Sequence, residues 1–145
     1  MSLRKIYETN TDLEKDGIWH TFDGFKVKIA RAGGFNSKLN HIMNEESKRF
    51  KREFGNSFLN DTELKIEWSA NCYAKSLIKG WQTYDKKQRK YVSGIELDPG
   101  KLLPYNTENV IKVFIELPEL MNAIYSVSRD AENYQVKEAA EEAKN

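Results

Sequence analysis

Few residues in this sequence are of types that could do chemistry. Cys72 is the only cysteine, and the two histidines are His20 and His41. A cysteine becomes a nucleophile when a neighbouring base takes its proton, so Cys72 with either histidine would be a catalytic pair. The other interpretation is that Cys72 is a small apolar residue packed on a helix beside Trp68. We expect the second and therefore no catalytic residue; an enzyme with Cys72 as nucleophile requires an accessible thiol near a histidine.

The sequence predicts no metal or cofactor site. Neither histidine belongs to an H-x-x-x-H pattern, and C-x-x-C is absent. Gly33-Gly34 is not followed by the lysine and serine or threonine of a phosphate-binding loop, so it indicates a turn. Glu45 and Glu46 are adjacent, and on a helix their side chains would point roughly 100° apart rather than converge.

Two basic segments interleaved with aromatic residues raise the alternative of nucleic-acid binding. Residues 48–52 lie in "KRFKREF", and residues 86–90 lie between Tyr84 and Tyr91. If they converged on one face, they would make a basic surface. The net charge of the whole chain is only +1, however, and a protein that binds phosphates usually has more. We therefore expect solvated charged surfaces and regard nucleic acid as an unlikely partner.

Three apolar residues fall outside any long helical stripe. Phe58, Leu59 and Ile95 lie in expected loops or short strands. Such residues can be exposed anchors for a helical partner or for a second copy of the chain. They can equally close the core over the ends of helices. The sequence leaves both interpretations open.

The composition is that of a soluble globular protein. The chain has 145 residues, of which 39% are hydrophobic and 31% charged, which indicates one domain. A single cysteine fits a reducing compartment, and the polar N-terminus has no apolar segment of a secretory signal. No apolar run approaches the roughly 20 residues that a membrane span needs. We expect an intracellular protein without membrane association.

The elements that would position these residues begin with a hairpin. Asp23-Gly24 is a strong turn signal, and Phe25, Val27 and Ile29 alternate with polar residues as in a strand. Residues 36–54 predict a helix that ends at Gly55. A second helix is expected from Asp61 or Thr62, because apolar residues recur at helical spacing as far as Trp81.

The second half of the chain predicts short strands and then helices. "YVSGIEL" suits one or two short strands, and Asn106 or Thr107 can cap a helix through Phe114. Pro118 suits the first turn of another helix, whose apolar stripe runs to Tyr134. The predicted fold is α+β, mostly α, with the N-terminal hairpin beside four to five helices. We expect a flexible segment at 1–16, one domain at 17–135 and a fraying helical tail at 136–145.

The order of these features resembles the tail assembly chaperones of long-tailed bacteriophages and prophages. The pattern W-x-x-x-D-G-x-x-x-x-I comes first, followed by "LIKGW", "LPYNTENVIKVF" and "LPELMNAIYSVSRDAENY". The resemblance covers roughly residues 17–145. It implies that the matching positions specify the fold, with Gly80 and Trp81 closing the middle helix onto the core. These positions are Trp19, Asp23, Gly24, Gly80, Trp81, Pro104, Tyr105 and Asn106.

The resemblance also implies a function without catalysis. Such chaperones bind the long helical tape measure protein, keep it soluble and help to recruit tail tube subunits around it. They leave before the virion is complete. For this chain the resemblance therefore implies the cytoplasm of a bacterial host, the tape measure and tail tube proteins as partners, and no cofactor.

Overall fold

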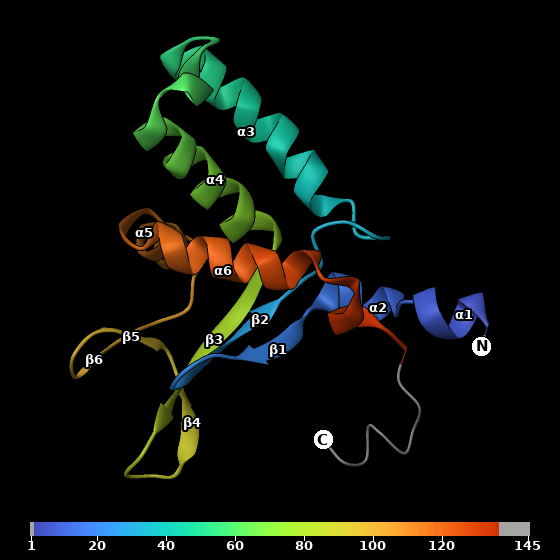
Figure 1. Cartoon of the computed structure of the whole chain (residues 1–145). Helices are drawn as coiled ribbons and strands as arrows, with labels where there is room; N and C mark the ends of the chain where they lie inside the picture. Colours follow the sequence, from blue (N-terminus) through green and yellow to red (C-terminus); the bar gives the residue numbers. More distant parts are fainter. Residues whose placement is uncertain (1, 137–145) are drawn as a thin grey trace.

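The computed structural model describes residues 2–136 (Figure 1). Helices and strands alternate in groups along the chain. They are α1 (Leu3–Tyr7), α2 (Thr11–Asp16), β1 (Ile18–Thr21), β2 (Phe25–Ile29), α3 (Lys38–Phe54), the 3-10 helix η1 (Phe58–Asn60), α4 (Thr62–Ser76), β3 (Ile78–Asp85), β4 (Lys90–Ser93), β5 (Ile95–Asp98), β6 (Lys101–Leu103), α5 (Thr107–Glu116), α6 (Pro118–Arg129) and the 3-10 helix η2 (Ala131–Tyr134). The predicted class, α+β with more helix than strand, is confirmed.

The predicted N-terminal hairpin is part of a larger sheet. Strands β1, β2, β3 and β4 are antiparallel neighbours in that order, and β5 and β6 form a separate hairpin. At the first turn, the Phe22 amide donates to the Phe25 carbonyl at 2.8 Å, and Gly24 has φ +82°. A positive φ of this size favours glycine, so Asp23-Gly24 forms the turn that its sequence predicts.

One face of this sheet belongs to the core. Val27 on β2 and Trp81 on β3 are register partners, and both are almost fully buried. Helices α4, α5 and α6 supply most of the other core residues, and Figure 1 shows α5 and α6 on one side of the sheet. The buried apolar residues of these helices are Ala70, Cys72, Ala74, Val110, Val113, Phe114, Met121 and Ile124.

Helices α3 and α4 run side by side away from the sheet (Figure 1). A polar cluster joins them. Glu46 on α3 is almost fully buried and accepts from Arg49 at 2.7 Å and from Lys75 on α4. Arg49 also donates to Asn71 Oδ1 on α4 at 3.2 Å. The buried carboxylate of Glu46 is therefore compensated by two cationic partners.

The helix expected from Asp61 to Trp81 is shorter than predicted. Asp61 caps it by accepting from the Leu64 amide at 3.0 Å, but the helix ends at Ser76, and Gly80 and Trp81 lie in strand β3. The prediction was wrong because a short apolar run such as Leu77-Ile78 can belong to a helix or to a strand, and pairing with β2 decides the outcome. Gly80 and Trp81 therefore do not close a helix end.

The last two helices begin where the sequence predicts. Asn106 caps α5 by accepting from the Asn109 amide at 2.8 Å, and Pro118 is the first residue of α6. The apolar stripe expected to run unbroken to Tyr134 does not form one helix. Helix α6 ends at Arg129, and Asp130 then caps the short helix η2 through the Glu132 amide at 3.0 Å. Aspartate is favoured at this position because its side-chain oxygen accepts from a backbone N–H group that has no partner within the helix.

The N-terminal segment differs from the expected loose chain at 1–16. Helices α1 and α2 form there, and Glu14 is completely buried. Its carboxylate accepts from Thr9 Oγ1 and Arg31 Nη1, both at 2.8 Å, and from the Phe35 amide at 3.2 Å. The polar composition of this segment predicted a loose chain. That prediction missed the fold because the sequence alone does not show the partners of Glu14.

The two ends of the described chain lie together (Figure 1). The Asn10 amide donates to the Tyr134 carbonyl at 2.7 Å, and the Tyr134 hydroxyl donates to the Ile29 carbonyl at 2.9 Å. The expected helical tail at 136–145 falls, apart from Val136, outside the described residues. None of the helices in residues 2–136 is long and apolar enough to cross a membrane.

Candidate functional site

The thiol of Cys72 is not placed to act as a nucleophile. Its side chain is completely buried in α4, and burial raises its pKa to about 12, an effect that the carboxylate of Glu46 reinforces. The thiol is therefore protonated near neutral pH, and a protonated thiol is a poor nucleophile. His41 has its side chain largely in solvent and 3.1 Å from Glu45. Nothing in this arrangement supports a Cys72 nucleophile.

Carboxylates, histidines and the cysteine do not gather elsewhere in the described part of the chain. Within residues 2–136, no group of three or more such side chains is arranged to hold a metal ion. The adjacent residues Glu45 and Glu46 separate as their spacing predicts, since Glu45 is exposed and Glu46 is buried between the helices.

The two basic segments do not form a common face. Residues 48–52 lie in the second half of α3, and residues 86–90 lie in and after the turn between β3 and β4. Figure 1 shows these at opposite ends of the molecule. Arg49 is moreover bonded to Glu46 and Asn71 and is not free for a phosphate. The convergence that two-segment nucleic-acid binding requires is absent from the structure.

Two of the three expected partner-binding residues belong to the core. Phe58 is 2% exposed and lies 5.5 Å, centroid to centroid, from the ring of Phe50. Ile95 is 7% exposed and packs in the main core. Only Leu59 is accessible. Of the two interpretations that the sequence left open, Phe58 and Ile95 therefore fit the second, because they close the core beside the ends of helices and strands.

Most of the eight signature positions have visible structural roles. The Trp81 indole donates to the Leu103 carbonyl at 3.1 Å and the Tyr105 hydroxyl donates to the Ile78 carbonyl at 2.8 Å, so both rings join β3 to the segment before α5. The Pro104 carbonyl accepts from the side chain of Asn109 at 2.9 Å. Trp19 is different, because its ring is 41% exposed.

Trp19 belongs to a set of side chains on the outer face of the sheet. The register pairs Trp19 with Lys28 and Tyr84 with Tyr91, and it pairs Lys26 with Gln82. These residues alternate with the buried ones and so share the face opposite Val27 and Trp81. We call Trp19, Lys26, Tyr84 and Tyr91 the ring–lysine face.

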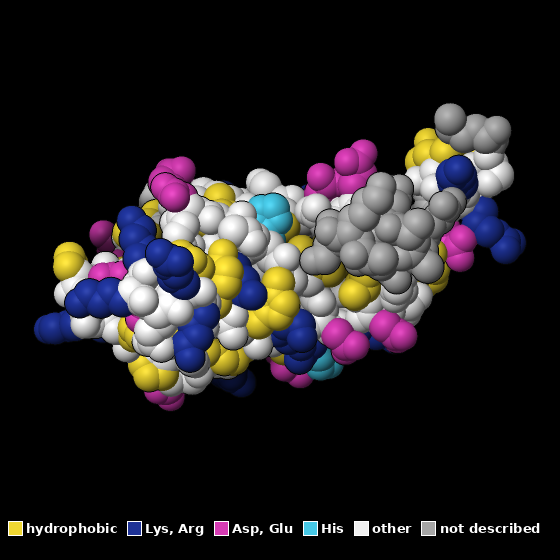
Figure 2. Space-filling view, turned by 90° about the horizontal axis from the view of Figure 1, so that it is seen from below, with side chains coloured by type: hydrophobic (Ala, Val, Ile, Leu, Met, Phe, Trp, Pro, Cys, Tyr) yellow, Lys and Arg dark blue, Asp and Glu magenta, His cyan; other side chains and the backbone are white. Residues whose placement is uncertain are grey.

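Cation–π contacts connect the ring–lysine face. The ammonium group of Lys26 lies 4.9 Å from the centroid of the Trp19 ring and 4.3 Å from that of Tyr91. The rings of Tyr84 and Tyr91 meet edge to face at 5.4 Å. Such contacts favour one arrangement of otherwise flexible side chains. Figure 2 shows basic and hydrophobic side chains interspersed on the side where the β1–β2 hairpin and β4 lie.

Gly80 allows the Trp19 ring to lie across the sheet. A Cβ atom at Gly80 would be 3.2 Å from Cη2 of Trp19, closer than ordinary van der Waals contact. The glycine in "LIKGW" thus makes room for an aromatic ring on the outer face. The sequence singled out Gly80 and Trp19, but it did not place them in contact because Gly80 was expected at a helix end.

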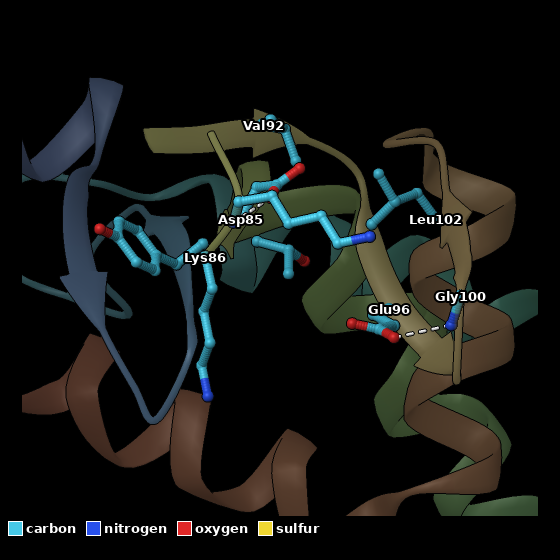
Figure 3. Close-up of a pocket in the computed structure, with 9 residues that line it drawn as sticks. Asp85, Lys86, Val92, Glu96, Gly100 and Leu102 are labelled. Atoms are coloured by element: carbon cyan, nitrogen blue, oxygen red, sulfur yellow. Dashed lines mark hydrogen bonds between the residues drawn. The ribbon is translucent and has the colours of Figure 1, made fainter. Parts of the chain in front are cut away.

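A shallow hollow of about 420 Å³ lies between the β3–β4 turn and the β5–β6 hairpin. Figure 3 shows Asp85 and Val92 on one side and Glu96, Gly100 and Leu102 on the other. Both carboxylates already have partners. Asp85 accepts from the Lys87 amide at 2.9 Å, and Glu96 accepts from the Gly100 amide at 2.7 Å. The hollow therefore offers little unpaired polarity to a ligand.

Lys26 and Lys28 are the functional candidates that sequence reasoning missed. Their alternation with Phe25, Val27 and Ile29 placed them on the outer face, but as ordinary solvated residues of a strand. The signal that was available is the presence of aromatic residues in the neighbouring strands, at Trp19 and Tyr91. Only the register shows that the ammonium group of Lys26 lies between these two rings.

Comparison with known proteins identifies the family. The model of the YdaY prophage protein family matches residues 35–145, which is most of the chain. The chain therefore belongs to the YdaY prophage protein family. No curated protein and no solved structure matches it.

Proposed function

We propose that this chain is a non-enzymatic tail assembly chaperone that binds the tape measure protein of its prophage and helps to recruit tail tube subunits. Membership of a prophage family supports a viral role of some kind. The observation that carries the proposal is the ring–lysine face, where Trp19 and Tyr84 are about 40% exposed beside lysines. Trp and Tyr are enriched at protein interfaces because they bury a large apolar area and keep a polar group.

A chaperone of this kind must cover apolar helices temporarily. A tape measure protein has long helical stripes that are exposed until the tail tube encloses them, and a bound chaperone would keep them from aggregating. Exchange with tube subunits requires a modest interface that dissociates readily. The chain would act in the cytoplasm of the bacterial host and be absent from the mature virion.

Nucleic-acid binding is the weaker candidate. It requires residues 48–52 and residues 86–90 to converge on one surface, and these segments lie far apart (Figure 1). An enzymatic role has no support from Cys72, whose buried thiol has a pKa raised to about 12. A binding protein without catalysis accounts best for the accessible aromatic face.

Co-expression tests the proposal. The tape measure protein of the same prophage is expressed alone and together with this chain carrying an affinity tag, and the soluble fractions are compared before and after affinity purification. The proposal predicts that the tape measure protein is insoluble alone and soluble, and co-purified, with this chain. A tape measure protein that aggregates equally in both cultures, with this chain eluting alone, would reject the proposal.

A further inference from the structure

We propose that the ring–lysine face is the docking surface for an α-helix that carries both apolar and acidic side chains. This inference rests on the proposed function, because it assigns the chaperone's partner-binding site. The face spans all four strands, with Trp19 from β1, Lys26 from β2, Tyr84 from β3 and Tyr91 from β4. The rings would contact the apolar side chains of that helix, and the surrounding lysines would contact its acidic side chains.

The rings provide accessible area for apolar side chains. The opposite face of the sheet is filled by Val27 and Trp81, which are at most 3% exposed, whereas Trp19 and Tyr84 are 41% and 40% exposed. Exposed aromatic rings on an ordered strand cost little conformational entropy when they become buried, because they have few rotatable bonds. The cation–π contacts of Lys26 order two of these rings before a partner arrives.

The dimensions suit a single helix. Neighbouring strands lie about 4.8 Å apart, so four strands are roughly 14 Å wide. A helix with its side chains is roughly 10 to 12 Å in diameter and would cover the face once. Strand addition at the edge is less favourable, because β4 has only four residues and begins with a lysine.

The surrounding charge favours an acidic partner. Lys26 and Lys28 lie on the face, and the β3–β4 connection next to Tyr84 and Tyr91 adds Lys86, Lys87 and Arg89. The carboxylate of Asp85 in that turn is occupied by the amides of Lys87 and Gln88. A second copy of this chain would bring the same lysines against this face, so charge repulsion disfavours self-association there.

The test uses the co-expression assay with two face variants and two matched controls. Trp19→Ala with Tyr91→Ala removes ring area, and Lys26→Glu with Lys28→Glu reverses charge. Phe35→Ala is the aromatic control, since that ring is 69% exposed elsewhere, and Lys112→Glu is the charge control on α5. Circular dichroism and urea midpoints establish that each variant folds before its binding is compared.

The inference predicts that both face variants recover at least tenfold less tape measure protein than the wild type, and that both controls recover as much as the wild type. The wild-type complex should also weaken as salt rises from 0.1 to 0.5 M, as expected for about two to four charge contacts. Acrylamide should quench Trp19 less in the complex than in the free protein.

Three results would overturn the inference, and they have different meanings. Folded face variants that recover wild-type amounts would place the partner elsewhere and leave the chaperone function standing. A wild type that recovers no tape measure protein would reject the function and this docking surface together. Wild-type protein that instead retains nucleic acid, and loses it with Trp19→Ala and Tyr91→Ala, would assign the face to single-stranded nucleic acid.

Discussion

Two buried glutamates, Glu14 and Glu46, connect elements that are distant in sequence. Glu14 joins α2 to the loop after β2 through Arg31, and Glu46 joins α3 to α4 through Lys75. Both sit in segments with many charged residues, where a glutamate is usually solvated. The sequence predicted a flexible segment around Glu14 and only diverging side chains for Glu45 and Glu46, because the partners that make burial favourable appear only in three dimensions.

Replacing Gly34 by alanine should strongly destabilise the protein. Gly34 has φ +59°, and a Cβ there would overlap Oε2 of Glu14 and displace the buried ion pair with Arg31. Gly55→Ala is the control, since Gly55 has φ +89° and open space around the added atom. We expect a loss of about 1 kcal/mol for Gly55→Ala from backbone conformation and at least about 3 kcal/mol for Gly34→Ala. Equal urea midpoints for the two variants would refute the clash.

Glu46 should make stability depend on pH. Burial alone would raise its pKa, but hydrogen bonds and charges from Lys75 and Arg49 outweigh burial and hold the pKa below 4.5. A lowered folded-state pKa contributes stability that is present above the unfolded-state value and is lost as pH falls through the folded-state value. Urea unfolding of the wild type and of Glu46→Gln should differ by about 1 to 3 kcal/mol at pH 7. The difference should shrink as pH falls below 4.5, and a constant difference would contradict this account.

The Cys72 thiol should resist modification in the folded protein. It is completely buried, and its pKa is raised to about 12. Reaction with a disulfide reagent at pH 8 should be at least about 100-fold slower than in 6 M urea, because both access and the thiolate are missing. Rapid modification of the native protein would reopen the question of a reactive cysteine.

At the scale of elements, turns and helix caps were predicted better than the helix ends that were inferred from apolar periodicity. Asp23-Gly24, Asp61, Asn106 and Pro118 each determine a local conformation through their own side chain or backbone, so neighbouring sequence suffices. Leu77 and Ile78 fit either a helix or a strand. Whether they extend α4 or begin β3 depends on pairing with β2, nearly 50 residues earlier in the sequence.

The cap of α5 provides a test at this scale. Asn106 Oδ1 accepts from the Asn109 amide at 2.8 Å. Asn106→Ala should cost about 1 kcal/mol of unfolding free energy, whereas Asn106→Asp keeps an acceptor and should cost clearly less. Thermal unfolding followed by circular dichroism measures both. Equal losses would mean that the side-chain acceptor does not stabilise the helix.

At the scale of the whole molecule, the N-terminal region is part of the folded structure although the family match begins at residue 35. Strand β2 lies inside the four-stranded sheet, and the Asn10 amide bonds the Tyr134 carbonyl. Helix α1, in contrast, buries no residue. The boundary that matters for stability therefore falls between α1 and α2.

Two truncations should separate these parts. Removal of residues 2–7 should change the unfolding free energy by less than about 1 kcal/mol, because no buried side chain is lost. Removal of residues 2–16 takes away Glu14 and leaves Arg31 without its buried partner, which should cost about 3 to 5 kcal/mol. Urea titration measures both, and two equally stable truncations would show that Glu14 does not stabilise the fold.

The candidate site was only partly predictable for a related reason. Trp19 was visible in the sequence as a signature position and Tyr91 as an aromatic residue beside a basic segment, but an interaction surface depends on which strand faces come together. Phe58 and Ile95 were candidates for exposed residues, and both are buried. The register that brings Lys26 between two rings is a property of the assembled sheet, which single segments do not encode.

The most direct test of the central claim, that this chain is a tail assembly chaperone, is to delete its gene from an inducible lysogen carrying this prophage. Tails are then counted by electron microscopy after induction, with the gene restored on a plasmid as control. The account predicts loss of at least nine tenths of the tails, aggregation of the tape measure protein, and recovery on complementation. Normal numbers of tails of normal length in the deletion strain would contradict it.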